Sequence, residues 1–163
     1  MRYVYLAGPI LGCTRGEANN WRDGFSERLR DIGIVGVSPL RCEPLIGDRY
    51  NLNYPDPRFG SARAIASKNK LDVKMCDMTL CYFPEGYSFS KGTLVELSWA
   101  SAYEKPTILV STVPEIVEHP VVQACANWVL SDLDEAFDVV AGVLQIYAEP
   151  PRPEEYLRNG VYR

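Results

Sequence analysis

Short β-rich runs alternate along this chain with segments of helical periodicity. Five runs predict strands: RYVYLAG (2–8), IVGVSP (34–39), MTLCYFP (78–84), PTILVS (106–111) and ANWVLSD (126–132). The spacing of apolar residues predicts helices over 19–33, 61–77, 93–103 and 131–144. Strands that alternate with helices form parallel sheets, because right-handed crossovers lay the helices against the sheet. The sequence therefore predicts an α/β fold, a doubly wound parallel five-stranded sheet with helices on both faces.

The length and composition fit one domain. The chain has 163 residues, of which 47% are hydrophobic and 23% charged, enough for a single core. No internal repeat or interdomain linker interrupts the alternation, and residues 148–163 are rich in proline and charge. We expect one α/β domain over residues 1–147 and a C-terminal tail over 148–163.

Charge and hydropathy exclude several kinds of partner. The net charge is −4 and no run of Lys or Arg forms a basic stripe, which argues against binding to a nucleic-acid polymer. The first 12 residues fit a strand better than a secretion signal, and no segment approaches the roughly 20 apolar residues of a membrane span. These features predict a cytoplasmic protein without a membrane partner.

The cysteines and the histidine do not suggest a metal centre. The five cysteines form no C-x-x-C pair, and the chain has one histidine, His119. An odd number of scattered cysteines is typical of reduced thiols in the cytosol. We therefore predict no metal, no other cofactor and no disulfide framework.

Glu96 is a single carboxylate in the largely apolar stretch SFSKGTLVELSWA (88–100). One interpretation is a capping box, in which Thr93 is the N-cap and Glu96 the N3 residue. The other is a functional carboxylate, because ligands of this fold class bind where the strands end and the following loops begin. Those segments are Gly8-Pro9-Ile10, the loop 41–60 and residues 85–92.

Three further groups have both a structural and a functional interpretation. The loop GPILGCTRGE lacks the P-loop and dinucleotide motifs, but its glycines with Arg15 fit a phosphate as well as a surface turn. Asp72 lies near a predicted helix end, where the helix dipole disfavours an acid. Asp77 precedes a strand and fits a turn equally well. Asp72 and Glu96 in one crevice would suit glycosyl chemistry.

Four motifs in this order resemble the nucleoside 2-deoxyribosyltransferase superfamily. They are YVYLAGPI at the start, the pair DVKMCD before a strand, S-x-G-T-x-x-E opening a helix, and A-x-x-x-x-K-P leading into the next strand. The resemblance implies a flavodoxin-like fold that acts on the N-glycosidic bond. It also implies that Glu96 is the nucleophile, Asp72 the acid that assists the departing base, and Tyr5 the tyrosine that positions the nucleophile.

One departure from the family pattern points to a branch of it. Deoxyribosyltransferases commonly have Asp six residues before the nucleophile, and this chain has Ser90. Serine there resembles the branch that hydrolyses nucleoside 5′-monophosphates. The resemblance implies a phosphate cradle of Ser90 and Gly92, facing Gly8, Pro9, Ile10 and Arg15, with Asp77 as a further substrate-binding candidate.

The resulting hypothesis is a hydrolase that cleaves the N-glycosidic bond of a nucleoside 5′-monophosphate through a glycosyl-Glu intermediate. The alternatives are a nucleoside 2-deoxyribosyltransferase that exchanges bases and a nucleotide-binding module without turnover. Family resemblance further predicts a homo-oligomer with shared sites, to which the tail contributes. The polar loop residues Tyr50, Asn51, Asn53 and Tyr54 fit base contacts or a solvated loop.

Overall fold

The computed structural model describes residues 1–86 and 90–145, apart from the side chain of Cys42. Its five strands are β1 (Arg2–Ala7), β2 (Ile34–Val37), β3 (Met78–Phe83), β4 (Thr107–Ser111) and β5 (Trp128–Leu130). They form one sheet in the order β2-β1-β3-β4-β5, and every neighbouring pair is parallel. This is the flavodoxin-like strand order, so the predicted fold class is confirmed.

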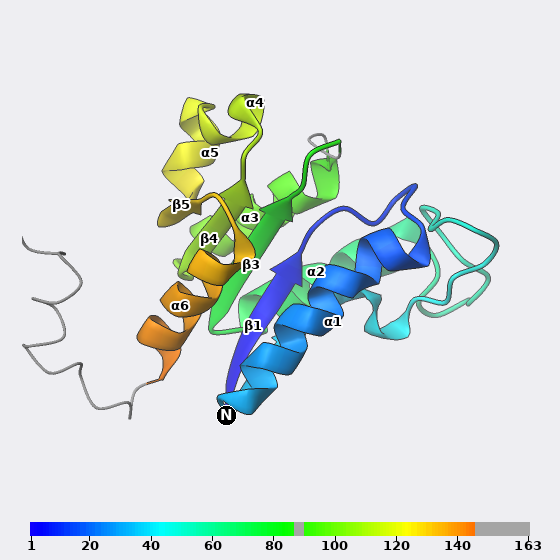
Figure 1. Cartoon of the computed structure of the whole chain (residues 1–163). Helices are drawn as coiled ribbons and strands as arrows, with labels where there is room; N and C mark the ends of the chain where they lie inside the picture. The colour runs from blue at the N-terminus through cyan, green and yellow to red at the C-terminus, as the bar shows by residue number, and fades with distance from the viewer. Residues whose placement is uncertain (87–89, 146–163) are drawn as a thin grey trace, which may run out of the picture.

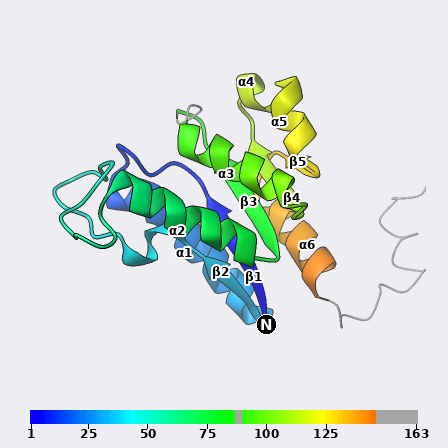
Figure 2. The ribbon, with the colours of Figure 1, turned by 180° about the vertical axis from the view of Figure 1, so that it is seen from behind.

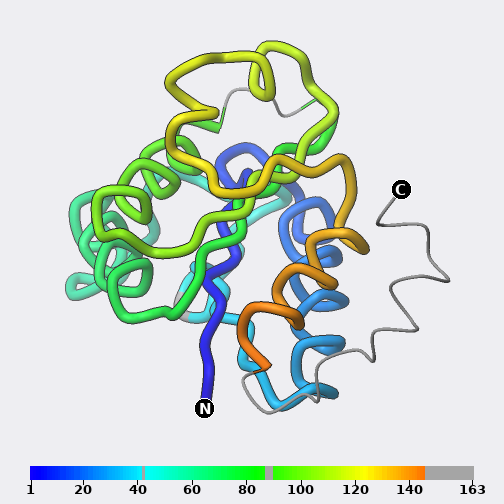
Figure 3. The backbone as a smooth tube through the Cα atoms, turned by 90° about the vertical axis from the view of Figure 1, so that its left-hand side faces the viewer, coloured from blue at the N-terminus to red at the C-terminus, as the bar shows by residue number. Residues whose placement is uncertain are grey.

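Helices cover both faces of the sheet. Those that follow β1, β2, β3 and β5 are α1 (Arg15–Asp31), α2 (Ala62–Met75), α3 (Lys91–Ala102) and α6 (Leu133–Leu144). Figure 1 shows α1 and α6 in front of the sheet, and Figure 2 shows α2 and α3 on the opposite face. In Figure 3 the strands run between these two layers.

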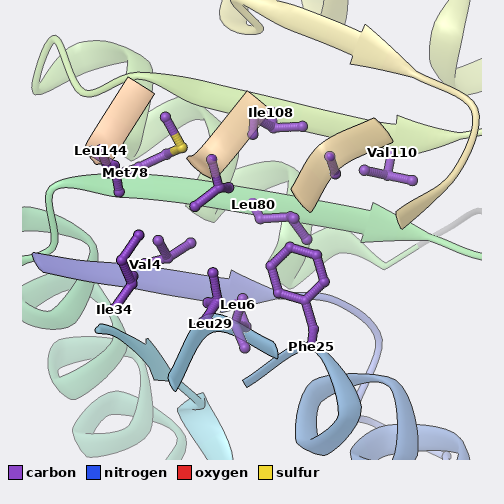
Figure 4. Close-up of a cluster of buried hydrophobic side chains, with 12 residues drawn as sticks. Val4, Leu6, Phe25, Leu29, Ile34, Met78, Leu80, Ile108, Val110 and Leu144 are labelled. Carbon is purple, nitrogen blue, oxygen red and sulfur yellow. The ribbon is translucent and has the colours of Figure 1, made fainter. Parts of the chain in front are cut away.

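Each face of the sheet has its own hydrophobic core, because side chains alternate along the strands. Toward α1 and α6 the core contains Val4, Leu6, Met78, Leu80, Ile108 and Val110, packed against Phe25, Leu29 and Leu144 (Figure 4). Toward α2 and α3 it contains Tyr5, Ala7, Cys81, Phe83 and Leu109, packed against Val73, Leu97 and Ala100. Tyr5 therefore points to the face that α3 covers.

Helix α1 begins four residues before its predicted start at 19. Thr14 is its N-cap and forms a capping box, in which its side chain accepts from the Glu17 amide and Glu17 accepts from the Thr14 amide. The motif T-x-x-E is present in the sequence as TRGE. Arg15 is consequently the first residue of a helix and not part of the loop.

Two short helices between β4 and β5 were not predicted. They are α4 (Pro114–Val117) and α5 (Pro120–Cys125), each with proline at its first position. Neither is long enough to display a hydrophobic period, which explains why the sequence pattern missed them. They lie beyond the carboxyl end of β4 (Figure 1).

The long loop after β2 is ordered by local hydrogen bonds. It starts with the 3-10 helix η1 (Pro39–Cys42). At its middle, the backbone of buried Tyr50 accepts from the Gly12 amide and donates to the Cys13 carbonyl, both at 2.9 Å. The Asn19 amide also donates to the Tyr50 hydroxyl at 3.0 Å. The loops after β1 and β2 are thus joined side by side.

No helix within residues 1–86 and 90–145 has the length and hydropathy needed to cross a membrane.

Candidate active site

Glu96 lies in the second turn of α3, because this helix begins earlier than predicted. Ser90 is the N-cap, and its hydroxyl accepts from the Thr93 amide and lies 2.7 Å from the Thr93 hydroxyl. Thr93 is thus the N3 residue and Glu96 the sixth residue of the helix. The capping-box interpretation of Thr93 and Glu96 is wrong.

The Glu96 carboxylate is bound by two side chains from other elements. The Tyr5 hydroxyl of β1 donates to Oε1 at 2.8 Å, and the Asn69 amide of α2 donates to the same oxygen at 3.0 Å. Glu96 is only 6% exposed and Tyr5 is fully buried. Side chains 27 and 91 residues distant from Glu96 in the sequence therefore meet at one carboxylate oxygen.

Burial is the largest influence on the pKa values of Glu96 and Tyr5. It raises the pKa of Glu96 from 4.5 to about 7, against the hydrogen bond from Tyr5 and the positive charge of Arg22, which lower it. Burial, and then the charge of Glu96, raises the pKa of Tyr5 well above 10.0. Tyr5 is therefore a neutral hydrogen-bond donor at physiological pH, while Glu96 titrates near neutrality.

Arg22 of α1 is a fully buried cation beneath the loop that follows β1. Its guanidinium donates to the carbonyls of Leu6, Gly8, Pro9 and Ala18. Burial lowers the pKa of Arg22 to about 10, whereas the charge of Glu96 raises it. The guanidinium thus remains charged and holds the segment from Leu6 to Pro9 in place.

Gly8 is required by this arrangement. A Cβ atom at Gly8 would lie 2.7 Å from the Trp21 ring and 3.1 Å from Nη2 of Arg22. The Gly8 carbonyl accepts from the same Nη2 at 2.9 Å. Gly8 therefore allows the close approach of α1 to the loop.

Asp72 is engaged by Arg41, which sequence reasoning did not single out. Both Asp72 oxygens accept from the guanidinium, at 2.5 and 2.6 Å. Asp72 is buried in the last turns of α2, while the Arg41 side chain, from η1, is 42% exposed. Two parallel charge-assisted hydrogen bonds are the arrangement that a guanidinium forms with an ionised carboxylate.

The proposed phosphate-binding residues lie in two segments at the carboxyl ends of β1 and β3. Gly8, Pro9 and Ile10 follow β1, whereas Ser90 and Gly92 begin α3 after β3. Gly92 lies one helical turn before Glu96, so both share a face of α3. The first turn of α3 has no acid and starts with exposed Lys91, a cation where the helix dipole favours an anion.

A family model described as nucleoside 2-deoxyribosyltransferase matches residues 4–134. The chain belongs to this family. It is an enzyme of the deoxyribosyltransferase type, and the match includes Tyr5, Asp72 and Glu96. A search of curated proteins finds no match.

Two solved structures share the fold of this deoxyribosyltransferase-family enzyme. CMP N-glycosidase BcmB from Clostridium botulinum aligns with a TM-score of 0.52 and 18% identity over 88% of this chain and 100% of that chain. The molybdenum cofactor binding protein from the phototrophic bacterium Rippkaea orientalis aligns with a TM-score of 0.56 and 15% identity over 88% and 98%. At these identities the likeness concerns the fold.

One predicted site residue lies apart from this constellation. Asp77 precedes β3, at the amino edge of the sheet, where it accepts from the Tyr3 amide at 2.8 Å and from Arg2 at 2.7 Å. This family member thus uses Asp77 to join β1 to the start of β3. Arg15 is exposed at the start of α1, and its carbonyl accepts from the Asn19 side chain.

Within the described part of the enzyme, no three His, Cys, Asp or Glu residues are grouped as metal ligands. Cys13, Cys76, Cys81 and Cys125 are free thiols. Burial raises the pKa of Cys76 to about 12 and that of Cys81 well above 9.0. These two thiols therefore stay protonated and are poor nucleophiles. The predicted tail lies outside the described residues, as do Tyr87, Ser88 and Phe89.

Proposed function

We propose that this enzyme hydrolyses the N-glycosidic bond of a nucleoside 5′-monophosphate. The observation that carries the proposal is the buried Glu96 carboxylate, whose Oε1 accepts from both Tyr5 and Asn69. An oxygen with two donors is a poor nucleophile, which leaves Oε2 to react. A carboxylate with a raised pKa is also a stronger nucleophile than an exposed one.

In the first step Oε2 of Glu96 attacks C1′ of the sugar. The C1′–O bond forms as the C1′–N bond breaks, and the electron pair of the broken bond stays on the base nitrogen. Glu96 must be ionised for this attack, so the rate should rise with pH through about 7, the pKa of Glu96. Tyr5 and Asn69 hold the carboxylate during the step.

The departing base takes a proton from Asp72. In the unliganded protein Asp72 is held by Arg41, in an arrangement typical of the ionised form. Asp72 can therefore act as an acid only when the base replaces Arg41 and the carboxylate takes up a proton from solvent. The partly exposed Arg41 side chain makes this exchange sterically feasible.

Water completes the reaction. It attacks C1′, gives its proton to the Asp72 carboxylate and breaks the bond to Glu96, so C1′ keeps its configuration. A deoxyribosyltransferase would share the first step and use a second base in place of water. Ser90 at the N-cap of α3 favours the nucleotide hydrolase, because its hydroxyl and the Gly92 amide suit a 5′-phosphate.

Three features support a phosphate opposite α3. Lys91 adds a cation at the helix start. Arg22 binds the Pro9 carbonyl at 3.5 Å, so the amide of Ile10, in the same planar peptide, points away from the guanidinium. That amide and Arg15 at the start of α1 are further anion donors. The proposed cradle therefore includes Gly8, Pro9, Ile10, Arg15, Ser90 and Gly92.

Membership of an enzyme family argues against a binding module without turnover, although a protein named for cofactor binding shares the fold. Burying an ionisable carboxylate costs free energy, which a binding module could avoid with a neutral side chain. The test is a panel of ribo- and deoxyribonucleotides with the matching nucleosides. Release of free base without an acceptor supports hydrolysis, release only with a second base supports transfer, and binding without release supports the module.

A further inference from the structure

Asn69 of α2 binds the nucleophile but has no assigned role. Its side chain is 8% exposed, and Nδ2 donates to Oε1 of Glu96 at 3.0 Å. Three residues later on the same helix face lies Asp72. One face of α2 therefore contacts the nucleophile through Asn69 and provides the second carboxylate.

Lys68 determines which way the Asn69 amide is turned. Its Nζ donates to Oδ1 of Asn69 at 2.9 Å. An ammonium group can only donate, so the oxygen of the amide must face Lys68 and the NH₂ group must face Glu96. If the amide were reversed, its NH₂ group would face the Lys68 ammonium and its oxygen would face the Glu96 carboxylate, so neither hydrogen bond could form.

Lys68 is itself held by the segment that follows β2. Its Nζ donates to the Pro39 carbonyl and lies 3.9 Å from Oε1 of Glu43, and both charged side chains are largely buried. A continuous set of contacts thus runs from the end of β2 through Lys68 and Asn69 to Glu96. The same segment contains Arg41, the partner of Asp72.

We propose that Asn69 is a positioning residue for Glu96, with its amide oriented by Lys68, so that Oε1 is anchored and Oε2 is presented to the substrate. Tyr5 and Asn69 reach the same oxygen from β1 and α2, which prevents rotation of the carboxylate. The proposal rests on the proposed nucleophilic role of Glu96, but the anchoring can be measured without any substrate.

The groups that interact electrostatically with Glu96 come from four neighbouring elements. They are Tyr5 of β1, Arg22 of α1, Lys68 of α2 and Cys81 of β3, while Asp72 interacts with Tyr5. Asn69 also contacts Glu96 but, unlike these groups, it cannot ionise. Its replacement therefore removes one hydrogen bond to Glu96 without changing any charge, which makes it a clean probe of anchoring.

The first experiment follows the titration of Glu96 by ¹³C NMR of side-chain carboxyls, with Glu96→Gln identifying the resonance. Asn69→Leu should raise the pKa of Glu96 by about one unit, since a lost donor to a carboxylate favours the neutral form. If Asn69→Leu does not fold, Asn69→Ala carries the same expectation. An unchanged titration in the folded variant would overturn the proposal.

Lys68 is tested with two variants and a matched control on the same helix. Lys68→Met should shift the pKa of Glu96 in the same direction, and by more than it does in an Asn69→Leu background, where only the charge of Lys68 is lost. Lys68→Arg, which keeps donors and charge, should leave the pKa within about 0.3 units. Lys74→Met removes an exposed lysine from α2 and should change nothing. A Lys68→Met variant that titrates like the wild type would show that the amide needs no orientation.

Turnover separates this inference from the proposed function. With a nucleotide that the wild type cleaves, Asn69→Leu should lower kcat at least about tenfold at pH 6.5 and change KM less than about threefold. The acid limb of its pH profile should move by the shift seen in NMR. If no substrate is cleaved by the wild type, the proposed function fails while the titration still decides the anchoring. A tenfold rise in KM with unchanged kcat would overturn the positioning role.

Discussion

At the scale of single residues, the environment of Glu96 allows folding and catalysis to be tested separately. Glu96→Gln keeps the side-chain length and an oxygen that can accept from Tyr5 and Asn69. Without a buried ionisable group, Tm at pH 7.5 should equal or exceed that of the wild type. Base release should fall by about three orders of magnitude or more, because an amide does not form the glycosyl ester.

Calorimetry and a base-release assay measure the two effects. Residual turnover above about a tenth of wild type would exclude a nucleophilic role, because a factor of ten is only about 1.4 kcal/mol of barrier.

The pKa of Glu96 also predicts how stability depends on pH. The folded protein holds this proton up to about pH 7, whereas the unfolded chain loses it near 4.5. The folded state therefore binds more protons between these values, and the stability from this group is complete below pH 4.5 and lost as pH rises through 7. The loss is on the order of 3 kcal/mol.

The measurement compares the free energy of unfolding of wild type and Glu96→Gln from pH 4.5 to 8. As pH rises, the free energy of unfolding of the wild type should fall relative to that of Glu96→Gln. If the two free energies changed with pH in parallel, the raised pKa of Glu96 would be contradicted.

The sequence predicted those site residues that belong to a short linear motif. Tyr5, Asp72 and Glu96 each belong to a short pattern, and the structure brings Tyr5 into contact with Glu96. Asn69, Arg22 and Arg41 lie outside those patterns, and their contacts depend on tertiary distances. A weak signal existed for Asn69, which lies three residues before Asp72 and so shares its helix face. Asp77 was selected by the same motif, but its contacts are at the opposite edge of the sheet.

At the scale of elements, the N-terminus of α3 predicts a preference for phosphorylated substrates. Ser90→Asp should preserve the helix, because aspartate is an equally good N-cap. Its negative charge should repel a 5′-phosphate beside it and reduce the preference for nucleotide over nucleoside by about tenfold or more, equivalent to about 1.4 kcal/mol.

Values of kcat/KM for a nucleotide and its nucleoside give this ratio. Ser90→Asn, a cap without charge, is the control and should keep most of the preference. A wild-type enzyme that cleaves both substrates equally well would refute the phosphate assignment.

The contact between α1 and the loop after β1 predicts a stability difference between two glycines. Gly8→Ala places a methyl group 2.7 Å from Trp21 and 3.3 Å from the Tyr82 carbonyl, and should destabilise the fold by about 1–3 kcal/mol. Gly24→Ala, in the same helix as Arg22 but with open space around it, should stabilise by about 0.5–1 kcal/mol.

Urea unfolding of both variants measures the two free energies. Equal stability of Gly8→Ala and wild type would show that the loop can move away from α1.

Element boundaries were predictable where a hydrophobic period or a turn residue marks them. Every predicted strand is present, and β1 and β3 end within one residue of their expected limits. The start of α1 was misplaced because the prediction followed the apolar period and passed over the T-x-x-E pattern at Thr14, whereas that of α3 was misplaced because Thr93 was taken as the N-cap. Thr14 and Glu17 form a capping box, but Thr93 and Glu96 do not, because Ser90 caps α3 instead. Local sequence alone cannot distinguish these outcomes.

At the scale of the whole molecule, α2 and α3, two helices in contact, each expose apolar side chains. Leu71 and Met75 are 58% and 70% exposed, and Val95 is 44% exposed. Together with the family resemblance, they lead us to expect a dimer or a larger homo-oligomer. Light scattering coupled to size exclusion measures the mass, and an active enzyme that is strictly monomeric would contradict the expectation.

The overall architecture was the most predictable level, because it depends on many weak signals that agree. The alternation of strands and helices fixes a parallel sheet whichever single boundary is misplaced. The division into residues 1–147 and 148–163 stays a prediction. Helices α4 and α5 were not predicted, because helices of four and six residues are too short to show a hydrophobic period. Their position depends on packing between β4 and β5.

The anchoring of Tyr50 changes how the long loop after β2 can respond to cleavage. Its two backbone hydrogen bonds to Gly12 and Cys13 divide the loop into two shorter spans, so the segment cannot swing open as one lid. Tyr54, Asp56 and Gly60 close the second span with bonds of their own. A protease that cuts near exposed Asn53 would leave both new ends attached to the body. The nicked protein would remain a single particle, assembled from two peptides that separate only in denaturant.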